Sequence, residues 1–130
     1  LIAAAGASAQ KRSFVRVLTY NVCEGLKMDT TASKERFVAW MRELDPDLAA
    51  LQEMNGFTQA RLEKLAAAYG HSYAVLLKDT GYPVALTSKY PIVAERVTDN
   101  MHHGFLLANT GGYNLQIAFS TGRLAGMLKK

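Results

Sequence analysis

The chain has 130 residues, of which 49% are hydrophobic, so it is long enough to form one domain with a buried core. Its formal net charge of +4 comes from the two ends. Residues 1–16 and 123–130 each hold three basic side chains, and the stretch between them holds 9 basic and 11 acidic ones. This distribution gives little support for a nucleic-acid-binding face, and the single cysteine, Cys23, excludes an intramolecular disulfide.

The N-terminal residues have the composition of a cleaved export signal. Leu1 to Ala9 is small and apolar, and its end, Ala7-Ser8-Ala9, fits the A-x-A pattern that signal peptidase cleaves after. We therefore expect residues 1–13 to be a signal-peptide remnant and a disordered N-terminus, with cleavage after Ala9 and a secreted or periplasmic product. A short disordered tail without an export role is the alternative. No stretch of the sequence is long enough to span a bilayer.

The first part of the chain has the pattern of a strand–helix–strand unit. Residues 14–22 are rich in β-branched and aromatic side chains, which favours a strand, and residues 24–29 are expected to form a loop. A helix follows and ends before Pro46, which cannot continue it. Residues 48–53 then predict a short buried strand, parallel to the first, with a right-handed crossover between them. The apolar face of the helix is expected to be Phe37, Trp40, Met41 and Leu44.

The remainder of the domain changes from helix to short strands. A second helix is expected over residues 58–69, with Gly70 as its C-terminal stop. Turn residues such as Thr110-Gly111-Gly112 then separate short strands, and such short connections favour antiparallel neighbours. The fold class is therefore α/β, with a mixed β-sheet and helices on one face over residues 14–119, and an irregular tail over residues 120–130. The expected strands are residues 71–77, 84–88, 92–97, 104–109 and 113–119.

Asn21 and Glu53 are the polar residues that end the two strands of the first unit. Sites in open α/β sheets form beyond the carboxyl ends of the strands, so we expect the two side chains in one crevice. A carboxylate there is a good ligand for Mg²⁺, which takes one or two protein carboxylates plus water and phosphate oxygens. An amide beside it can orient a phosphate or a metal-bound water. The structural alternative is that Glu53 caps the next helix and Asn21 makes a local turn.

Three sequence segments occur in an order typical of one known family. They are Val17-Leu18-Thr19-Tyr20-Asn21-Val22, Asp45-Pro46-Asp47-Leu48-Ala49-Ala50-Leu51-Gln52-Glu53 and Ser88-Lys89-Tyr90-Pro91-Ile92. With them the chain, over about residues 14–117, resembles the endonuclease/exonuclease/phosphatase superfamily. Its members include deoxyribonuclease-like nucleases, inositol phosphate phosphatases and neutral sphingomyelinases. The resemblance implies Mg²⁺-dependent hydrolysis of phosphate esters and a fold of two mixed sheets flanked by helices, so that this chain is half of a four-layer αββα sandwich.

The resemblance also implies roles for individual residues. Glu53 becomes the ligand of Mg²⁺ or Mn²⁺, and Asn21 becomes a catalytic residue that contacts the metal or the scissile phosphate. His102 and His103 lie where family members often place a phosphate-contacting His or Tyr. We choose His103 as the catalytic candidate, with a solvated turn pair as the alternative. The substrate is a phosphate ester, and the sequence does not separate nucleic acid, phospholipid headgroups and inositol phosphates.

The C-terminal part of the sequence departs from the family. After the strand at Tyr113–Ile117 the family usually has a polar residue followed by His-Leu, whereas this chain continues Ala118-Phe119-Ser120. No histidine follows His103 and no Asp or Glu follows Asp99, so the family's later Asp-x-Asn and Asp-His pairs are absent.

These departures predict the N-terminal part of a phosphoesterase, inactive on its own. Most of the second sheet is expected to be missing, which leaves one face of the first sheet uncovered. The alternative, from another functional class, is a non-catalytic remnant or a binding module.

Two other residues are predicted to have structural roles. Cys23 follows the first strand, and we expect a buried, unreactive thiol there. His71 follows the helix stop at Gly70, and we expect it to interact with the C-terminus of that helix.

Overall fold

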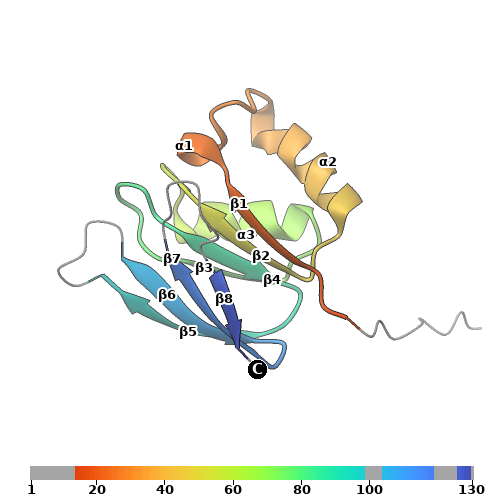
Figure 1. Ribbon diagram of the computed structural model, residues 1–130. Helices are drawn as coiled ribbons and strands as arrows, with labels where there is room; N and C mark the ends of the chain where they lie inside the picture. Colours follow the sequence, from red (N-terminus) through yellow and green to blue (C-terminus); the bar gives the residue numbers. More distant parts are fainter. Residues whose placement is uncertain (1–13, 99–103, 119–125, 130) are drawn as a thin grey trace, which may run out of the picture.

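The computed structural model describes residues 14–98, 104–118 and 126–129. These residues form three layers, in which helices cover one face of a first sheet and a second sheet packs on its other face (Figure 1). The strand order of the first sheet is β1 (Val17–Asn21), β2 (Leu48–Gln52), β4 (Ala85–Ser88) and β3 (Tyr73–Leu76). The order of the second is β5 (Ile92–Val97), β6 (Phe105–Thr110), β7 (Tyr113–Ala118) and β8 (Gly126–Lys129).

The first sheet is mixed, because β1 and β2 are parallel and the other pairs are antiparallel. In the parallel pair Val17 lies opposite Leu48, and Asn21 lies opposite Gln52. β2 is buried along its whole length, as its apolar sequence predicts, since one face meets the helices and the other meets the second sheet. The prediction of an α/β fold with a mixed sheet and helices on one face is confirmed.

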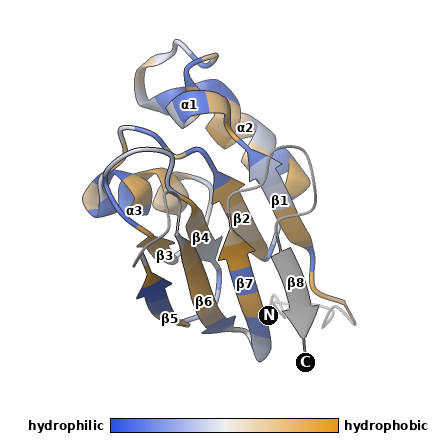
Figure 2. Ribbon diagram, turned by 60° about the vertical axis from the view of Figure 1, so that its left-hand side comes forward, coloured by the Kyte–Doolittle hydropathy of each residue, from blue (hydrophilic) through white to orange (hydrophobic). Residues whose placement is uncertain are grey.

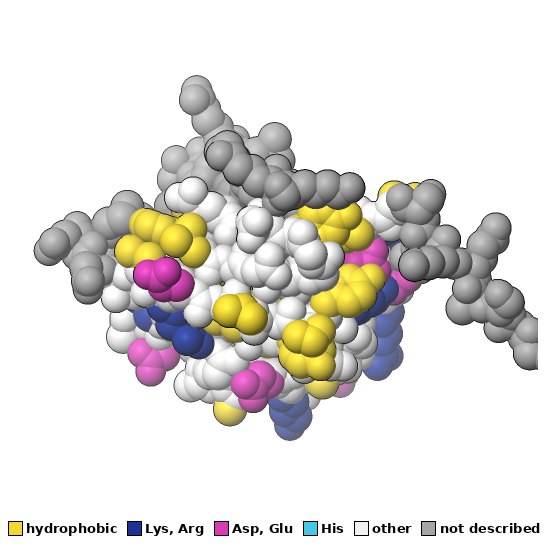
Figure 3. Space-filling view, turned by 90° about the horizontal axis from the view of Figure 1, so that it is seen from below, with side chains coloured by type: hydrophobic (Ala, Val, Ile, Leu, Met, Phe, Trp, Pro, Cys, Tyr) yellow, Lys and Arg dark blue, Asp and Glu magenta, His cyan; other side chains and the backbone are white. Residues whose placement is uncertain are grey.

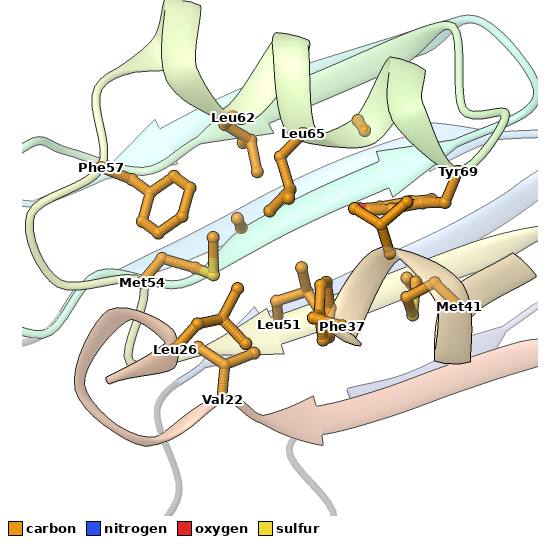
Figure 4. Close-up of a cluster of buried hydrophobic side chains, with 14 of the residues drawn as sticks. Val22, Leu26, Phe37, Met41, Leu51, Met54, Phe57, Leu62, Leu65 and Tyr69 are labelled. Carbon is orange, nitrogen blue, oxygen red and sulfur yellow. The ribbon is translucent and has the colours of Figure 1, made fainter. Parts of the chain in front are cut away.

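The predicted first helix is α2 (Glu35–Leu44), which follows a short 3-10 turn, η1 (Ala32–Lys34). It stops at Asp45, whose φ of 47° is left-handed, immediately before Pro46. Its predicted apolar stripe faces the sheet and contributes to the core drawn in Figure 4. The stripe residues of this core are Phe37 and Met41, with Trp40 packed against them.

The predicted second helix is α3 (Gln59–Ala68), and its start is fixed by a cap. The Thr58 hydroxyl accepts a hydrogen bond from the Arg61 N–H at 3.2 Å. α3 packs beside α2 on the same face of the first sheet (Figure 4). Its buried side chains are Leu62, Leu65 and Ala66. No helix in the described ranges is long and apolar enough to cross a membrane.

The second sheet corrects the expectation that one face of the first sheet is uncovered. It is antiparallel, and its inward side chains pack against Leu48, Ala50 and Leu86 of the first sheet. Hydrophobic and hydrophilic residues alternate along β7, as Figure 2 shows, which matches a strand with one buried face. The inward side chains of the second sheet include Leu106, Ala108, Leu115 and Ile117.

The C-terminal residues also differ from the prediction of an irregular tail over residues 120–130. Residues 126–129 form β8, which pairs antiparallel with β7 and lies at the edge of the second sheet. The strand was not predicted because Gly126-Met127-Leu128-Lys129 does not alternate between apolar and polar side chains.

At the amino end of β2, the Asp45-Pro46-Asp47 segment makes hydrogen bonds to residues beside two other strands. Lys89, which follows β4, donates to Asp45 Oδ1 at 2.7 Å and to Asp47 Oδ1 at 3.1 Å. The backbone N–H of Arg16, which precedes β1, donates to Asp47 Oδ2 at 2.8 Å. The segment therefore joins the starts of two strands to the end of a third, at the opposite end of β2 from Glu53.

A buried chain of hydrogen bonds includes His71. Its Nε2 lies 2.8 Å from the Pro46 carbonyl oxygen, so Nε2 carries the proton and Nδ1 accepts from the Thr87 hydroxyl at 2.8 Å. The Thr87 oxygen in turn lies 2.9 Å from the Tyr69 hydroxyl, which donates to it. The side chain of His71 thus hydrogen-bonds to β4 and to the segment before β2. The expected interaction with the end of the helix is made only by the backbone N–H of His71, which donates to the Ala66 oxygen.

This burial makes the stability of the protein depend on pH. Burial lowers the pKa of His71 below its usual 6.5, and it raises the pKa of Tyr69 to about 12. The unfolded chain therefore takes up the His71 proton first as the pH falls, and the free energy of unfolding decreases from about pH 6.5 downward. The slope contributed by one proton is at most about 1.4 kcal/mol per pH unit.

Urea unfolding of wild type and of His71→Gln between pH 8 and pH 5 measures this effect. We expect the variant to be less stable at pH 8 but to lose less stability on acidification. Parallel pH profiles would contradict a neutral, buried His71.

Candidate metal-binding site

The carboxyl ends of β1 and β2 bring Asn21 and Glu53 into contact, as the sequence predicts. Asn21 is the last residue of β1, and Glu53 follows Gln52, its partner in the register. The Asn21 Nδ2 group donates a hydrogen bond to Glu53 Oε1 at 3.0 Å. Asn21 is exposed and Glu53 is half-buried, so the pair is open to solvent at the edge where α/β sheets form their sites.

The orientation of the Asn21 amide is fixed by its second contact. The backbone N–H of Cys23 donates to Asn21 Oδ1 at 2.9 Å. Only the oxygen of the amide can accept that bond, so the nitrogen must face the carboxylate. Asn21 therefore makes the local turn of the structural alternative and also orients Glu53, and its role toward a phosphate or a metal-bound water stays a prediction.

The residues after β1 form a left-handed turn, α1 (Cys23–Leu26), where a loop was predicted. Its φ angles are positive throughout: 58° at Cys23, 48° at Glu24, 72° at Gly25 and 62° at Leu26. Residues other than glycine rarely adopt this region, at a cost of roughly 1–2 kcal/mol each. The turn also places Cys23 at the surface, which makes the prediction of a buried thiol wrong.

Glu53 holds the left-handed turn in place. Its Oε2 accepts from the Glu24 N–H at 3.0 Å, and its backbone oxygen accepts from the Gly25 N–H at 2.7 Å. One residue earlier, the Val22 N–H donates to the Gln52 oxygen at 3.0 Å. Both carboxylate oxygens of Glu53 are thus oriented by N–H donors, one from a side chain and one from the backbone.

Two charged residues beside the site were not identified from the sequence. Lys27 donates to Glu24 Oε2 at 2.6 Å, with both side chains about half exposed. This hydrogen bond, together with the nearby negative charge of Glu24 and Glu53, raises the pKa of Lys27. Their only sequence signal is position, because both lie within six residues of Asn21 in the segment that leaves the strand.

Gln52 has a structural role beneath the site. It is buried, and its Nε2 donates to the Thr19 hydroxyl at 3.0 Å and to the Ala50 oxygen at 3.3 Å. These bonds lock the end of β2 against β1. They fix the backbone from which Glu53 projects.

The donor set fits a hard divalent cation that keeps most of its water. No cluster of three or more His, Cys, Asp or Glu side chains occurs within residues 14–98, 104–118 and 126–129. Mg²⁺ is usually bound through one or two carboxylates, with waters and substrate oxygens as its other ligands. Each oxygen of Glu53 accepts one hydrogen bond, which leaves lone pairs for a cation. An exposed edge with a single oriented carboxylate suits such an ion.

The other predicted site residue falls elsewhere in the chain. His103, with its neighbour His102, lies outside the described residues, and so does the predicted cleavage site after Ala9. The roles given to Asn21, Glu53 and His103 by the family resemblance stay predictions.

Comparison with known proteins identifies the family. A model of the Endonuclease/Exonuclease/phosphatase family matches residues 18–123, so the chain belongs to that family. The resemblance drawn from the sequence motifs is confirmed. No curated protein matches the sequence.

Two solved structures share the fold at low sequence identity. One is an AP endonuclease from Archaeoglobus fulgidus, with a TM-score of 0.60 and 18% identity, and the match covers 82% of this chain and 41% of that one. The other is a D. rerio TDP2 humanised by 14 mutations, with a TM-score of 0.55 and 16% identity, covering 80% of this chain and 45% of that one. The chain therefore spans less than half the length of either protein.

Proposed function

We propose that this chain is the N-terminal part of a divalent-metal-dependent phosphoesterase, in which Glu53 is a ligand of Mg²⁺ or Mn²⁺. The observation that carries the proposal is the contact between Asn21 and Glu53 at the ends of two parallel strands, in a member of this family. The order of the sequence motifs supports the N-terminal position, and the covered share of the two solved structures, 41% and 45%, supports a part of a longer domain.

The residues of this chain prepare the carboxylate for its role. Asn21 Nδ2 and the Glu24 N–H each hold one oxygen of Glu53, so the carboxylate loses little freedom when it binds a cation. Asn21 Nδ2 has a second proton to donate, and a phosphate oxygen is the partner that the family resemblance implies. When bound, the divalent ion neutralises charge on the phosphoryl group and lowers the pKa of a coordinated water.

The rest of the proposal concerns residues and substrate. We propose that His103 contacts the phosphate and that the protein is exported with cleavage after Ala9, which N-terminal sequencing at Gln10 tests. The substrate class is a phosphate ester, whether nucleic acid, phospholipid headgroup or inositol phosphate. Lys and Arg are interspersed with Asp and Glu on the face seen in Figure 3, so that face gives no preference for nucleic acid.

Hydrolysis of bis(p-nitrophenyl) phosphate by the purified chain tests the proposal. We expect binding of Mg²⁺ in a calorimetric titration, and any hydrolysis to require Mg²⁺ or Mn²⁺ and to stop when EDTA is added. Hydrolysis that continues in EDTA would contradict the proposal. Metal binding without hydrolysis is the result expected of the N-terminal part on its own. A chain that neither binds the metal nor hydrolyses the ester would favour the second candidate, a non-catalytic remnant or binding module.

A further inference from the structure

A groove of about 600 Å³ lies between the start of α2 and one face of α3, and none of its lining residues belongs to the candidate metal-binding site. We call it the helix groove. The α3 residues that line it recur three or four positions apart, so their side chains share one face of that helix. The residues that matter for its chemistry are Lys34, Phe57, Arg61, Lys64, Leu65 and Ala68.

The floor of the helix groove is apolar. Phe57 and Leu65 are buried against the core, as Figure 4 shows, and the small side chain of Ala68 leaves the space above them open. A groove of this size falls in the range of roughly 300–1,000 Å³ that small-molecule sites occupy. Eight described residues line it, whereas a stable protein interface takes roughly 20–30 residues from each partner.

The rim of the helix groove is cationic. The Arg61 guanidinium lies over the Phe57 ring, with Cζ 4.9 Å from the ring centroid, and its Nη1 donates to the Gly56 oxygen at 2.6 Å. These contacts hold the guanidinium in place and leave other N–H groups of its fork to donate. Lys34 donates to the Leu26 and Asp29 oxygens at 3.0 and 2.8 Å, and Lys64 is exposed beside Arg61.

No carboxylate lines the helix groove among the described residues. The nearest one along α3, Glu63, accepts a hydrogen bond from Gln59 Nε2 at 2.8 Å. Gln59 Nε2 also donates to the Ala74 oxygen at 2.7 Å, which draws this pair toward β3 and away from the groove. Arg61 and Lys64 therefore face the groove with no carboxylate in its described lining, whereas Lys34 lies near the buried carboxylate of Asp29.

We propose that the helix groove binds a single-chain lipid with an anionic head group. The head group meets Arg61 and Lys64, and the alkyl chain lies on the apolar floor formed by Phe57, Leu65 and Ala68. Arg is well suited to the head group, because its planar fork pairs with both oxygens of a carboxylate or phosphate. Binding requires both the head group and the alkyl chain, because the groove is open and water competes with each contact on its own.

Isothermal titration of the 130-residue chain with sodium decanoate, below its micelle concentration, tests this proposal. We expect saturable binding of decanoate, at least tenfold weaker binding of butanoate, and none of decyltrimethylammonium. Equal affinities for decanoate and butanoate would show that the alkyl chain does not bind the apolar floor. Binding of decyltrimethylammonium as strong as that of decanoate would overturn the role of the cations.

Two pairs of variants locate the ligand. Arg61→Gln with Lys64→Gln should weaken decanoate binding at least tenfold, whereas Arg36→Gln, an exposed cation outside the groove, should not change it. Ala67 is an exposed alanine of α3 that also lines the groove, so Ala67→Trp fills the groove and should abolish binding. Ala60→Trp, at an exposed alanine of the same helix outside the groove, should not. Unchanged affinity in both groove variants would overturn the proposal.

Discussion

Replacing Gly25 with alanine is expected to lower the free energy of unfolding by roughly 3–5 kcal/mol. The φ of Gly25 is +72°, which disfavours any side chain, and a Cβ built there lies 2.0 Å from the Asn55 backbone oxygen. That oxygen cannot move freely, because it belongs to the backbone two residues after Glu53. The Gly25 N–H itself donates to the Glu53 oxygen, so relief of the clash separates the left-handed turn from the end of β2.

Gly56→Ala is the matched control for this prediction. Gly56 has almost the same φ, +73°, but a Cβ there meets nothing within 4 Å. Its replacement should therefore cost only about 1–2 kcal/mol, the conformational part of the effect. Urea unfolding followed by circular dichroism gives both values. Equal losses in the two variants would show that the turn does not pack against Asn55 as described.

Replacing Glu53 with glutamine is expected to weaken Mg²⁺ or Mn²⁺ binding by about 100-fold or more, about 2.7 kcal/mol. The substitution keeps the size of the side chain and removes the negative charge that a hard cation requires. It also disturbs the site's orientation. Glu53 accepts from Asn21 Nδ2 and from the Glu24 N–H, and a carboxamide has one accepting oxygen in place of two.

Glu63→Gln is the control, because it makes the same chemical change on the exposed surface of α3. Calorimetric titration of wild type and of the two variants with MgCl₂ and MnCl₂ measures the affinities. We expect Glu63→Gln to bind as wild type does. Wild-type affinity in the Glu53→Gln protein would show that this carboxylate does not bind the metal.

The contact between Asn21 and Glu53 could be predicted because its signals are local. Pro46 marks the end of the helix, and a run of apolar residues after it indicates a buried strand. A polar residue at the end of each of two parallel strands then places both side chains at one edge of the sheet. Each of these signals is read from a few neighbouring residues and requires no knowledge of contacts that are distant in the sequence.

The left-handed turn could not be predicted, because its conformation is imposed from outside. Cys23, Glu24 and Leu26 have no intrinsic preference for positive φ, and Gly25 is the one local signal. Hydrogen bonds from the turn to Glu53, which lies 29 residues from Glu24, hold it in place. Tertiary contacts of this kind leave no periodic pattern in the sequence.

The second sheet and the role of His71 were missed for a related reason. Alternation and turn residues indicate which strands neighbour one another, and a meander has the same pattern whether it continues one sheet or begins another. For His71, the partners that decide its role are Thr87 and Pro46, which lie 16 and 25 residues away.

The metal site at Glu53 is tested most directly by a Mn²⁺ titration of the ¹⁵N-labelled chain, followed by NMR. Mn²⁺ broadens the signals of nuclei near it, and the Asn21 side-chain amide and the Glu24 backbone amide both donate to Glu53 at 3.0 Å. A metal bound by this carboxylate broadens these two signals first in wild type and leaves them sharp in Glu53→Gln. Broadening that begins at carboxylates elsewhere, with both signals unchanged, would contradict a metal site at Glu53.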